Sequence, residues 1–136
     1  MLVPCEVAVK TVSPAIRALL AKTLLQQHKM KEIQVAQILG ITQSAVSKYS
    51  KNVRGITIPL ENVSDLQPIM AKMIGLLLVQ PLQTAQQMEM MTLFCQACAA
   101  IRINGLMCPL CQKNMKTPID ECTFCHNTEF CSQKTL

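Results

Sequence analysis

Apolar side chains recur at helical spacing along most of the chain, and this pattern predicts a mainly α fold. Ser13-Pro14 has the form of an N-cap followed by a first-turn proline, which predicts a helix from there to about Lys29. Further helices are expected over 32–39, 42 to about 51, 64 to about 80, and 84–103. Pro81 separates the last two helices, and residues 56–62 form a linker or a short extended arm.

Residues 32–55 predict two short helices that cross at a tight turn. Ala36 is small where the partner helix approaches, and Gly40 can adopt the positive φ of a sharp turn. Thr42 is a suitable N-cap for the second helix, whose Val46 and Tyr49 face the core. The side chains expected to point outward are Gln43, Ser44, Ser47 and Lys48.

The run A-x3-G-x5-V-x2-Y, formed by Ala36, Gly40, Val46 and Tyr49, resembles the helix-turn-helix of Cro/repressor-type (XRE-type) transcriptional regulators. The longer string LGITQSAVSKY, followed by Arg54-Gly55, resembles the archaeal branch of that family. The resemblance covers about the first half of the chain and implies that double-stranded DNA is the partner. The outward-facing residues of the second helix would then read base edges. The remaining expected DNA contacts, mostly to phosphates, are Thr42, Lys51, Arg54, Arg17 and Lys22.

The charge distribution agrees with a polyanionic partner. The 136-residue chain carries a net charge of +5, and residues 10–54 hold eight Lys and Arg residues against the single acid Glu32. Residues 55–94 are net negative. Basic side chains that neutralise phosphates supply most non-specific DNA affinity, so the position of the excess favours DNA binding by the first half.

The sequence has no secretory signal and no apolar stretch long enough to span a bilayer, so a cytoplasmic protein without a membrane partner is expected. In a reducing compartment, clustered thiols more often bind metal than form disulfides. Seven of the eight cysteines lie near the C-terminus: Cys95, Cys98, Cys108, Cys111, Cys122, Cys125 and Cys131.

The spacing of these cysteines predicts metal binding, but it leaves the metal open between zinc and an iron–sulfur cluster. The first two C-x2-C pairs fit one four-thiolate zinc site, and the CPLC segment resembles a zinc-ribbon knuckle. A second site would need His126 or Cys5 as its fourth ligand. The chain also resembles DNA-binding regulators with a cysteine-ligated cluster, which implies a sensor of iron, sulfide or redox state. The C-x-x-C-H match at Cys122 is not interpreted as a haem site, because haem attachment normally takes place outside the cytosol.

Three regions are expected: a helix-turn-helix DNA-binding domain over 1–58, a helical dimerisation region over 59–104, and a Cys-rich metal-binding tail over 105–136 that also uses Cys95 and Cys98. The long helix carries one apolar stripe at Met88, Met91, Cys95 and Cys98, and a second at Met90, Phe94, Ala97 and Ile101. Because helix-turn-helix proteins usually bind two half-sites as two-fold dimers, a homodimer through this helix is expected. The metal site at its C-terminal end would alter the dimer and thereby DNA binding.

The predicted function is a sequence-specific transcriptional regulator, not an enzyme, with no small-molecule substrate. Two alternatives remain at this point. The first is a DNA-binding adaptor with purely structural zinc, and the second is a thiol oxidoreductase that uses a C-x2-C pair. The sequence has no strand pattern before the C-x2-C pairs and no phosphate-binding glycine loop, so it does not favour an enzyme.

Overall fold

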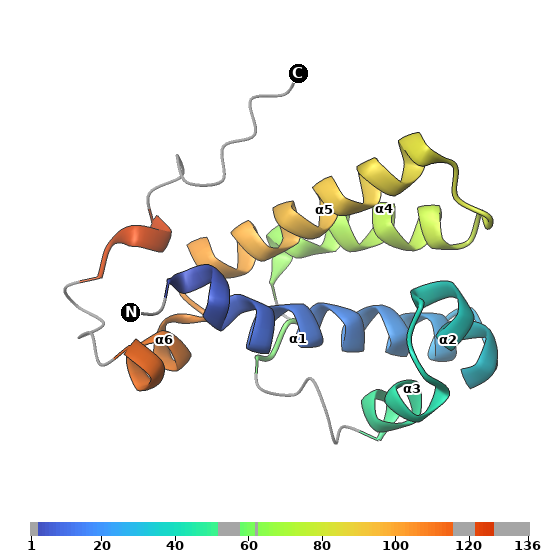
Figure 1. Cartoon of the computed structure of the whole chain (residues 1–136), viewed down its shortest axis with the longest axis horizontal. Helices are drawn as coiled ribbons and strands as arrows, with labels where there is room; N and C mark the ends of the chain where they lie inside the picture. Colours follow the sequence, from blue (N-terminus) through green and yellow to red (C-terminus); the bar gives the residue numbers. More distant parts are fainter. Residues whose placement is uncertain (1–2, 52–57, 62, 116–121, 127–136) are drawn as a thin grey trace.

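The computed structural model describes residues 3–51, 58–61, 63–115 and 122–126, and this part of the chain is helical without strands (Figure 1). The predicted mainly α class is confirmed. The elements are α1 (Pro4–Gln26), α2 (Glu32–Leu39), α3 (Gln43–Ser50), the 3-10 turn η1 (Ser64–Leu66), α4 (Gln67–Leu77), α5 (Thr84–Ile103), α6 (Cys108–Met115) and the 3-10 turn η3 (Phe124–His126).

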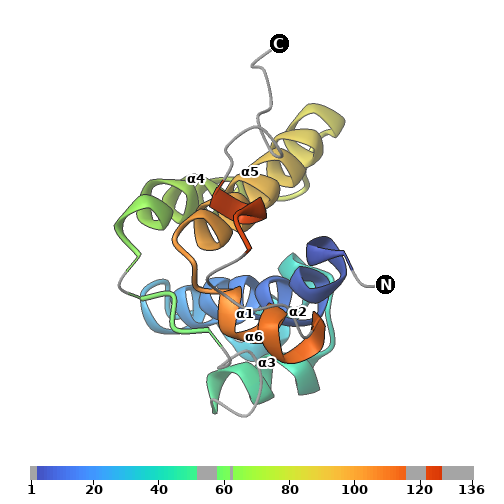
Figure 2. The same ribbon diagram turned by 90° about the vertical axis from the view of Figure 1, so that its left-hand side faces the viewer.

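Helix α1 lies between two groups of helices (Figures 1 and 2). The antiparallel hairpin of α4 and α5 covers one side of α1, while α2 and α3 pack on the other side and α6 packs near its start. Its buried side chains therefore lie around much of its circumference rather than along one stripe. They include four alanines, which let neighbouring helices approach closely: Val7, Ala8, Val12, Ala15, Ile16, Ala18, Leu20, Ala21 and Leu24.

The start of α1 differs from the prediction. The helix begins at Pro4, ten residues before Pro14, which lies in its interior. The Val3 backbone N–H donates to Glu6 Oε2 at 2.7 Å, and Pro4 occupies the first turn, where a missing N–H is tolerated. Pro14 leaves the carbonyl of Lys10 without its usual helical donor, but Lys10 is exposed, so water can replace that donor. Burial of Val7 and Val12 outweighs the local cost of the proline.

The turn between α2 and α3 has the predicted chemistry. Gly40 ends α2 in the left-handed conformation, with φ of 65°, and the Ile41 N–H returns to the carbonyl of Ala36 at 3.0 Å. Thr42 caps α3, because its Oγ1 accepts the Ala45 N–H at 3.1 Å. Buried Val46 and Tyr49 hold the inner face of α3 against the core, as expected.

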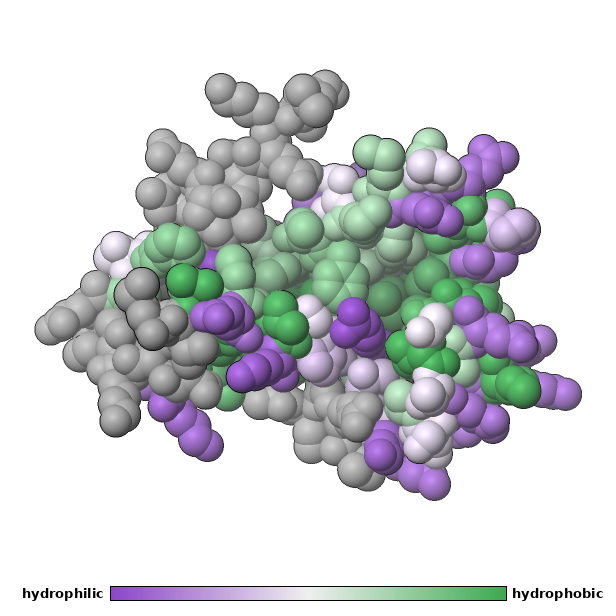
Figure 3. All heavy atoms as spheres, in the orientation of Figure 1, coloured by the Kyte–Doolittle hydropathy of each residue, from purple (hydrophilic) through white to green (hydrophobic). Residues whose placement is uncertain are grey.

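In the α4–α5 hairpin, one of the two apolar stripes of α5 faces the core and the other faces solvent. Helix α4 ends at Leu77, about three residues before the expected end, and α5 has the expected bounds. The stripe through Ala97 and Ile101 is buried, whereas Met88 and Met91 are 61% and 62% exposed. Apolar surface extends along α5 in Figure 3. None of the helices in the described part of the chain combines the length and apolar character needed to cross a bilayer.

Two glycines give a matched test of this fold. Neither Gly40 nor Gly75 has an atom within 4 Å of an added Cβ, so only backbone conformation distinguishes them. We expect Gly40→Ala to destabilise the protein by about 1 kcal/mol, because alanine is strained at positive φ. Gly75→Ala in α4 should stabilise it by about 0.5–1 kcal/mol. Urea unfolding followed by circular dichroism measures both, and the same sign for the two variants would contradict the turn geometry.

Candidate functional site

The outward face of α3 carries the four side chains predicted to read bases. Gln43, Ser44 and Lys48 are exposed, and Ser47 is partly buried. At 100° per residue these four positions lie within one continuous arc, opposite buried Val46 and Tyr49. Thr42 is exposed at the N-terminus of the same helix, although its hydroxyl already accepts the capping hydrogen bond. The helix thus presents amide, hydroxyl and ammonium groups side by side to solvent.

The basic residues predicted to contact phosphate have different surroundings. Lys51 is exposed at the end of α3, and Arg54 lies outside the described residues. The Arg17 guanidinium carbon lies 5.5 Å from the centroid of the Phe94 ring on α5, a cation–π contact that directs Arg17 toward the α4–α5 side of α1. Lys22 is partly buried and lines a small cavity beside Ile58 and Leu60.

A second candidate site lies at the end of the molecule where α1 begins and α5 ends. Both ribbon views place α6 and η3 at this end (Figures 1 and 2). The thiols of Cys108 and Cys111 are on α6, and those of Cys122 and Cys125 are before and within η3. The CPLC segment, whose sequence resembles a zinc-ribbon knuckle, forms the first turn of α6.

The buried side chain of Arg102, near the end of α5, lies among these thiols. It is only 2% exposed. Its Nε donates to Cys125 Sγ at 3.5 Å, and its Nη1 donates to Cys5 Sγ at 3.7 Å. Its guanidinium carbon lies 5.8 Å from the centroid of the Phe124 ring. Burial opposes its charge, but attraction to Cys125, Cys5 and Cys98 outweighs that effect and raises the pKa of Arg102.

The two α6 thiols are held in the neutral form. Burial raises the pKa of Cys108, and repulsion between its ionised form and the ionised forms of Cys125 and Cys122 raises that pKa further. Burial likewise raises the pKa of Cys111, with the same neighbours adding to the effect and Arg102 opposing it. The four cysteines are therefore near enough to influence one another's charge. A raised pKa is the opposite of what a reactive, nucleophilic thiol requires.

Not every predicted ligand belongs to this group. Cys95 is on the exposed side of α5, and Cys131 lies outside the described residues. Within 3–51, 58–61, 63–115 and 122–126, no three Cys, His, Asp or Glu side chains converge on one point at ligand distances. Thiols are the donors that a thiophilic metal prefers, but the thiols in the described part of the chain form no group that could hold such an ion.

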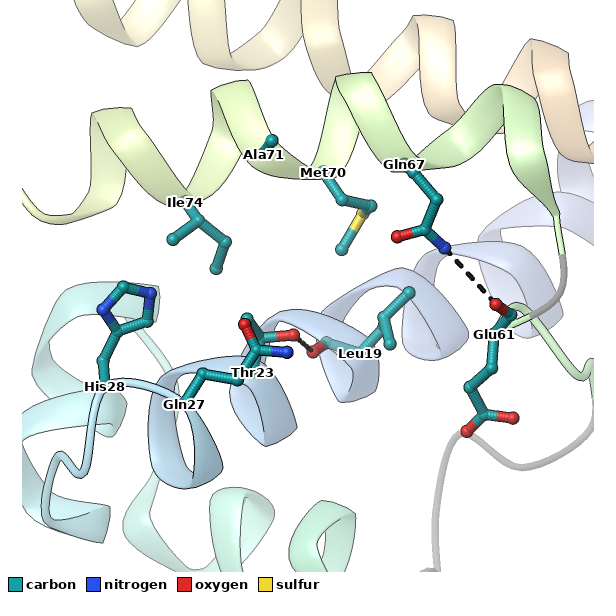
Figure 4. Close-up of a pocket in the computed structure, with 9 residues that line it drawn as sticks. All are labelled: Leu19, Thr23, Gln27, His28, Glu61, Gln67, Met70, Ala71 and Ile74. Atoms are coloured by element: carbon teal, nitrogen blue, oxygen red, sulfur yellow. Dashed lines mark hydrogen bonds between the residues drawn. The ribbon is translucent and has the colours of Figure 1, made fainter.

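A cavity of about 430 Å³ separates α1 from α4 (Figure 4). The Gln67 amide nitrogen donates to the backbone carbonyl of Glu61 at 3.3 Å, and the Glu61 carboxylate points away from the cavity. The volume of this cavity is within the range of small-ligand pockets. The lining residues are Leu19, Thr23, Gln27, His28, Glu61, Gln67, Met70, Ala71 and Ile74.

Comparison with known proteins gives no match: no protein family, curated protein or solved structure shows significant similarity to the chain.

Sequence reasoning missed Arg102 and gave Cys5 only as one of two possible fourth ligands of a second metal site. The available signal was weak: Arg102 follows Cys98 by four residues, which puts both on one helix face, and it interrupts an apolar run at the end of α5. Cys5 carries no motif. Only the packing of α1 against α5 and α6 brings it near Arg102.

Proposed function

We propose that the chain is a sequence-specific, DNA-binding transcriptional regulator whose cysteine cluster binds zinc or an iron–sulfur cluster. The observation that carries DNA binding is the exposed polar face of α3, held outward by the αL turn at Gly40 and by buried Val46 and Tyr49. Helices α2 and α3 would act as a helix-turn-helix, with α3 in the major groove. The resemblance of this segment to Cro/repressor-type regulators supports the same function.

Within this proposal the residues of α3 divide into two roles. Gln43 suits adenine, Lys48 suits guanine, and Ser44 and Ser47 can donate to or accept from several bases. Lys51, exposed at the end of the helix, suits phosphate and would set register without reading sequence. Arg17 is a weaker candidate than its sequence position suggested, because its guanidinium stacks on Phe94.

The first test compares base reading with phosphate binding. Gln43→Ala should reduce discrimination at one base pair by about 1–3 kcal/mol, because a bidentate amide contact is lost. Lys51→Ala should weaken binding to all DNA sequences alike. It should also reduce the slope of log affinity against log salt concentration by about one, which corresponds to one released counterion. Binding of selected and random duplexes at several salt concentrations measures both effects. Gln96→Ala and Lys72→Ala, at exposed positions on α5 and α4, are the matched controls. Equal effects of Gln43→Ala on both duplexes would contradict the assignment.

The proposed metal centre uses predicted cysteine ligands that the structure describes, namely Cys98, Cys108, Cys111, Cys122 and Cys125. The partly buried thiols of Cys108 and Cys111 on α6 become strong ligands once a metal displaces their protons. Both zinc and an iron–sulfur cluster accept cysteine thiolates. The raised pKa values of Cys108 and Cys111 disfavour the thiol oxidoreductase alternative.

Metal content and DNA affinity together separate a sensor from a structural adaptor. Anaerobic purification should yield a protein with stoichiometric zinc, or a brown protein with iron and acid-labile sulfide. If the centre is a sensor, a folded Cys98→Ser variant should bind operator DNA about tenfold more weakly or more tightly than the holo protein, because the two states differ in affinity. Identical affinity in a gel-shift titration, with folding verified by circular dichroism, would leave the metal only a structural role.

We also propose a homodimer that pairs through the exposed stripe of α5. Met88 and Met91 are large apolar side chains left in solvent, and flexible methionines suit such an interface. Light scattering at micromolar concentration should give twice the 15.1 kDa mass of one chain. Met91→Glu should weaken the dimer at least tenfold, because it introduces like charges into the seam, whereas Val9→Glu at an exposed position of α1 should not. A monomeric wild-type protein would contradict this proposal.

A further inference from the structure

The cavity between α1 and α4 has apolar walls and polar ends. Met70 and Ile74 are one helical turn apart on α4, and they point across the cavity toward α1, which contributes Leu19 (Figure 4). The methionine and the isoleucine are mostly buried, with 6% and 7% of their surface exposed. In the same view His28 and Gln67 lie at opposite ends of the cavity. A ligand that fills this space therefore needs an apolar body with hydrogen-bonding groups at its edge.

The polar side chains around the cavity offer both donors and acceptors. The Thr23 hydroxyl already donates to the Leu19 carbonyl at 2.8 Å, so its oxygen can only accept from a ligand. The Gln67 amide nitrogen donates to the Glu61 carbonyl, whereas its carbonyl oxygen lies on the cavity side (Figure 4). Gln27, at the end of α1, carries an amide that can donate as well as accept. These groups match a ligand that both donates and accepts hydrogen bonds, as an amide does.

Few charged groups face the cavity. Its described lining includes neither lysine nor arginine, and the Glu61 carboxylate points away from it (Figure 4). The one basic side chain of that lining is His28, at the end opposite Gln67. A carboxylate or phosphate close to the acceptor oxygens of Thr23 and Gln67 would lose its hydration without a cation to replace it. An uncharged ligand avoids that cost.

We propose that the cavity between α1 and α4 is a binding site for a small, uncharged aromatic ligand with an amide-type edge. A flat ring fits between two facing helices, and methionine sulfur packs favourably against aromatic rings. Because Gln27 and His28 lead into α2, the bound ligand would contact both α4 and the segment that precedes the proposed helix-turn-helix. The site shares no residue with the exposed face of α3 or with the thiols, so it depends on neither DNA nor metal binding.

The test titrates the full chain with nicotinamide, a small uncharged aromatic amide, and follows methionine methyl signals by NMR. The Met70 methyl group reports on the cavity. The methyl groups of Met88 and Met91, exposed on α5, report on non-specific contact with apolar surface. Nicotinate is the matched charged probe, because it has the same ring with a carboxylate in place of the amide.

Two variants alter the cavity, and each has a matched control. Ala71 lines the cavity from an exposed position on α4, so Ala71→Phe fills the space without entering the core. Ala85→Phe adds the same ring at an exposed position of α5 that does not line the cavity. Gln27→Ala removes a donor and an acceptor, and Gln26→Ala is its control at the neighbouring exposed position.

In wild type the Met70 signal should shift saturably, with a dissociation constant of about 1–10 mM for a ligand of about nine non-hydrogen atoms. Ala71→Phe should weaken binding at least about tenfold because its ring occupies the space. Gln27→Ala should weaken binding about 3–10-fold through the lost hydrogen bonds. Nicotinate should bind wild type at least about tenfold more weakly than nicotinamide does. Both control variants should stay within about twofold of wild type.

Several outcomes would overturn the inference. One is the absence of a saturable shift at Met70, and another is an equal shift at Met70, Met88 and Met91. Unchanged affinity in a folded Ala71→Phe variant, or equal affinity for nicotinate and nicotinamide, would also overturn it. Should Ala71→Phe fail to fold by circular dichroism, Gln27→Ala and the nicotinate comparison decide by the same criteria. Since the titration contains neither DNA nor metal, a failed DNA-binding or metal-binding test would leave this inference standing, and the reverse holds as well.

Discussion

The burial of α1 around much of its circumference is the constraint on which the other elements depend. Val12, Ile16 and Leu24 have no exposed surface, and the intervening alanines bring α3, α5 and α6 close to the same rod. Burying a large apolar side chain contributes roughly 1.5–3 kcal/mol, so α1 alone accounts for a large share of the core. Among the described helices, α1 packs against α2 and α3 and also against α5 and α6, which carry the thiols. Helix α1 therefore positions both candidate sites relative to each other.

This arrangement differs from the structural connection that was expected between the metal site and the DNA-binding helix. Coupling was expected through α5 and a dimer interface. In the structure the first turn of α1 contacts Arg102 through Cys5, and the later turns of α1 support α3. The 23 residues of α1 form a rod of roughly 34 Å at 1.5 Å per residue. Both candidate sites are therefore supported by the same helix within one chain, and a dimer through α5 is not needed to connect them.

How far the sequence predicts the structure depends on the range of the interactions involved. Helices α2, α3 and α5 follow from local signals such as Gly40 and the Thr42 cap, and their bounds agree with the prediction. The start of α1 does not, because Ser13-Pro14 is a convincing local start signal that tertiary burial of Val7 and Val12 overrides. The thiol group shows the same limit. Cysteine spacing predicted pairs along the chain, whereas the contact of Cys5 with Arg102 depends on packing between residues 97 positions apart.

The presence of a buried arginine at the end of α5 is hard to explain by stability alone. Replacing a buried charge and its partners with apolar side chains of similar volume is often neutral or stabilising. The surroundings could accept such a side chain, since Ile101 and Met107 are buried nearby in the sequence and Phe124 lies over the guanidinium. A structural core would gain little from the arginine, whereas the sulfur acceptors of Cys125 and Cys5 gain a charged hydrogen-bond donor. Among the described residues no group of three or more potential ligands could hold a metal ion, and the contacts that the structure shows for these thiols are with the guanidinium itself, whose Nε and Nη1 donate to Cys125 Sγ and Cys5 Sγ.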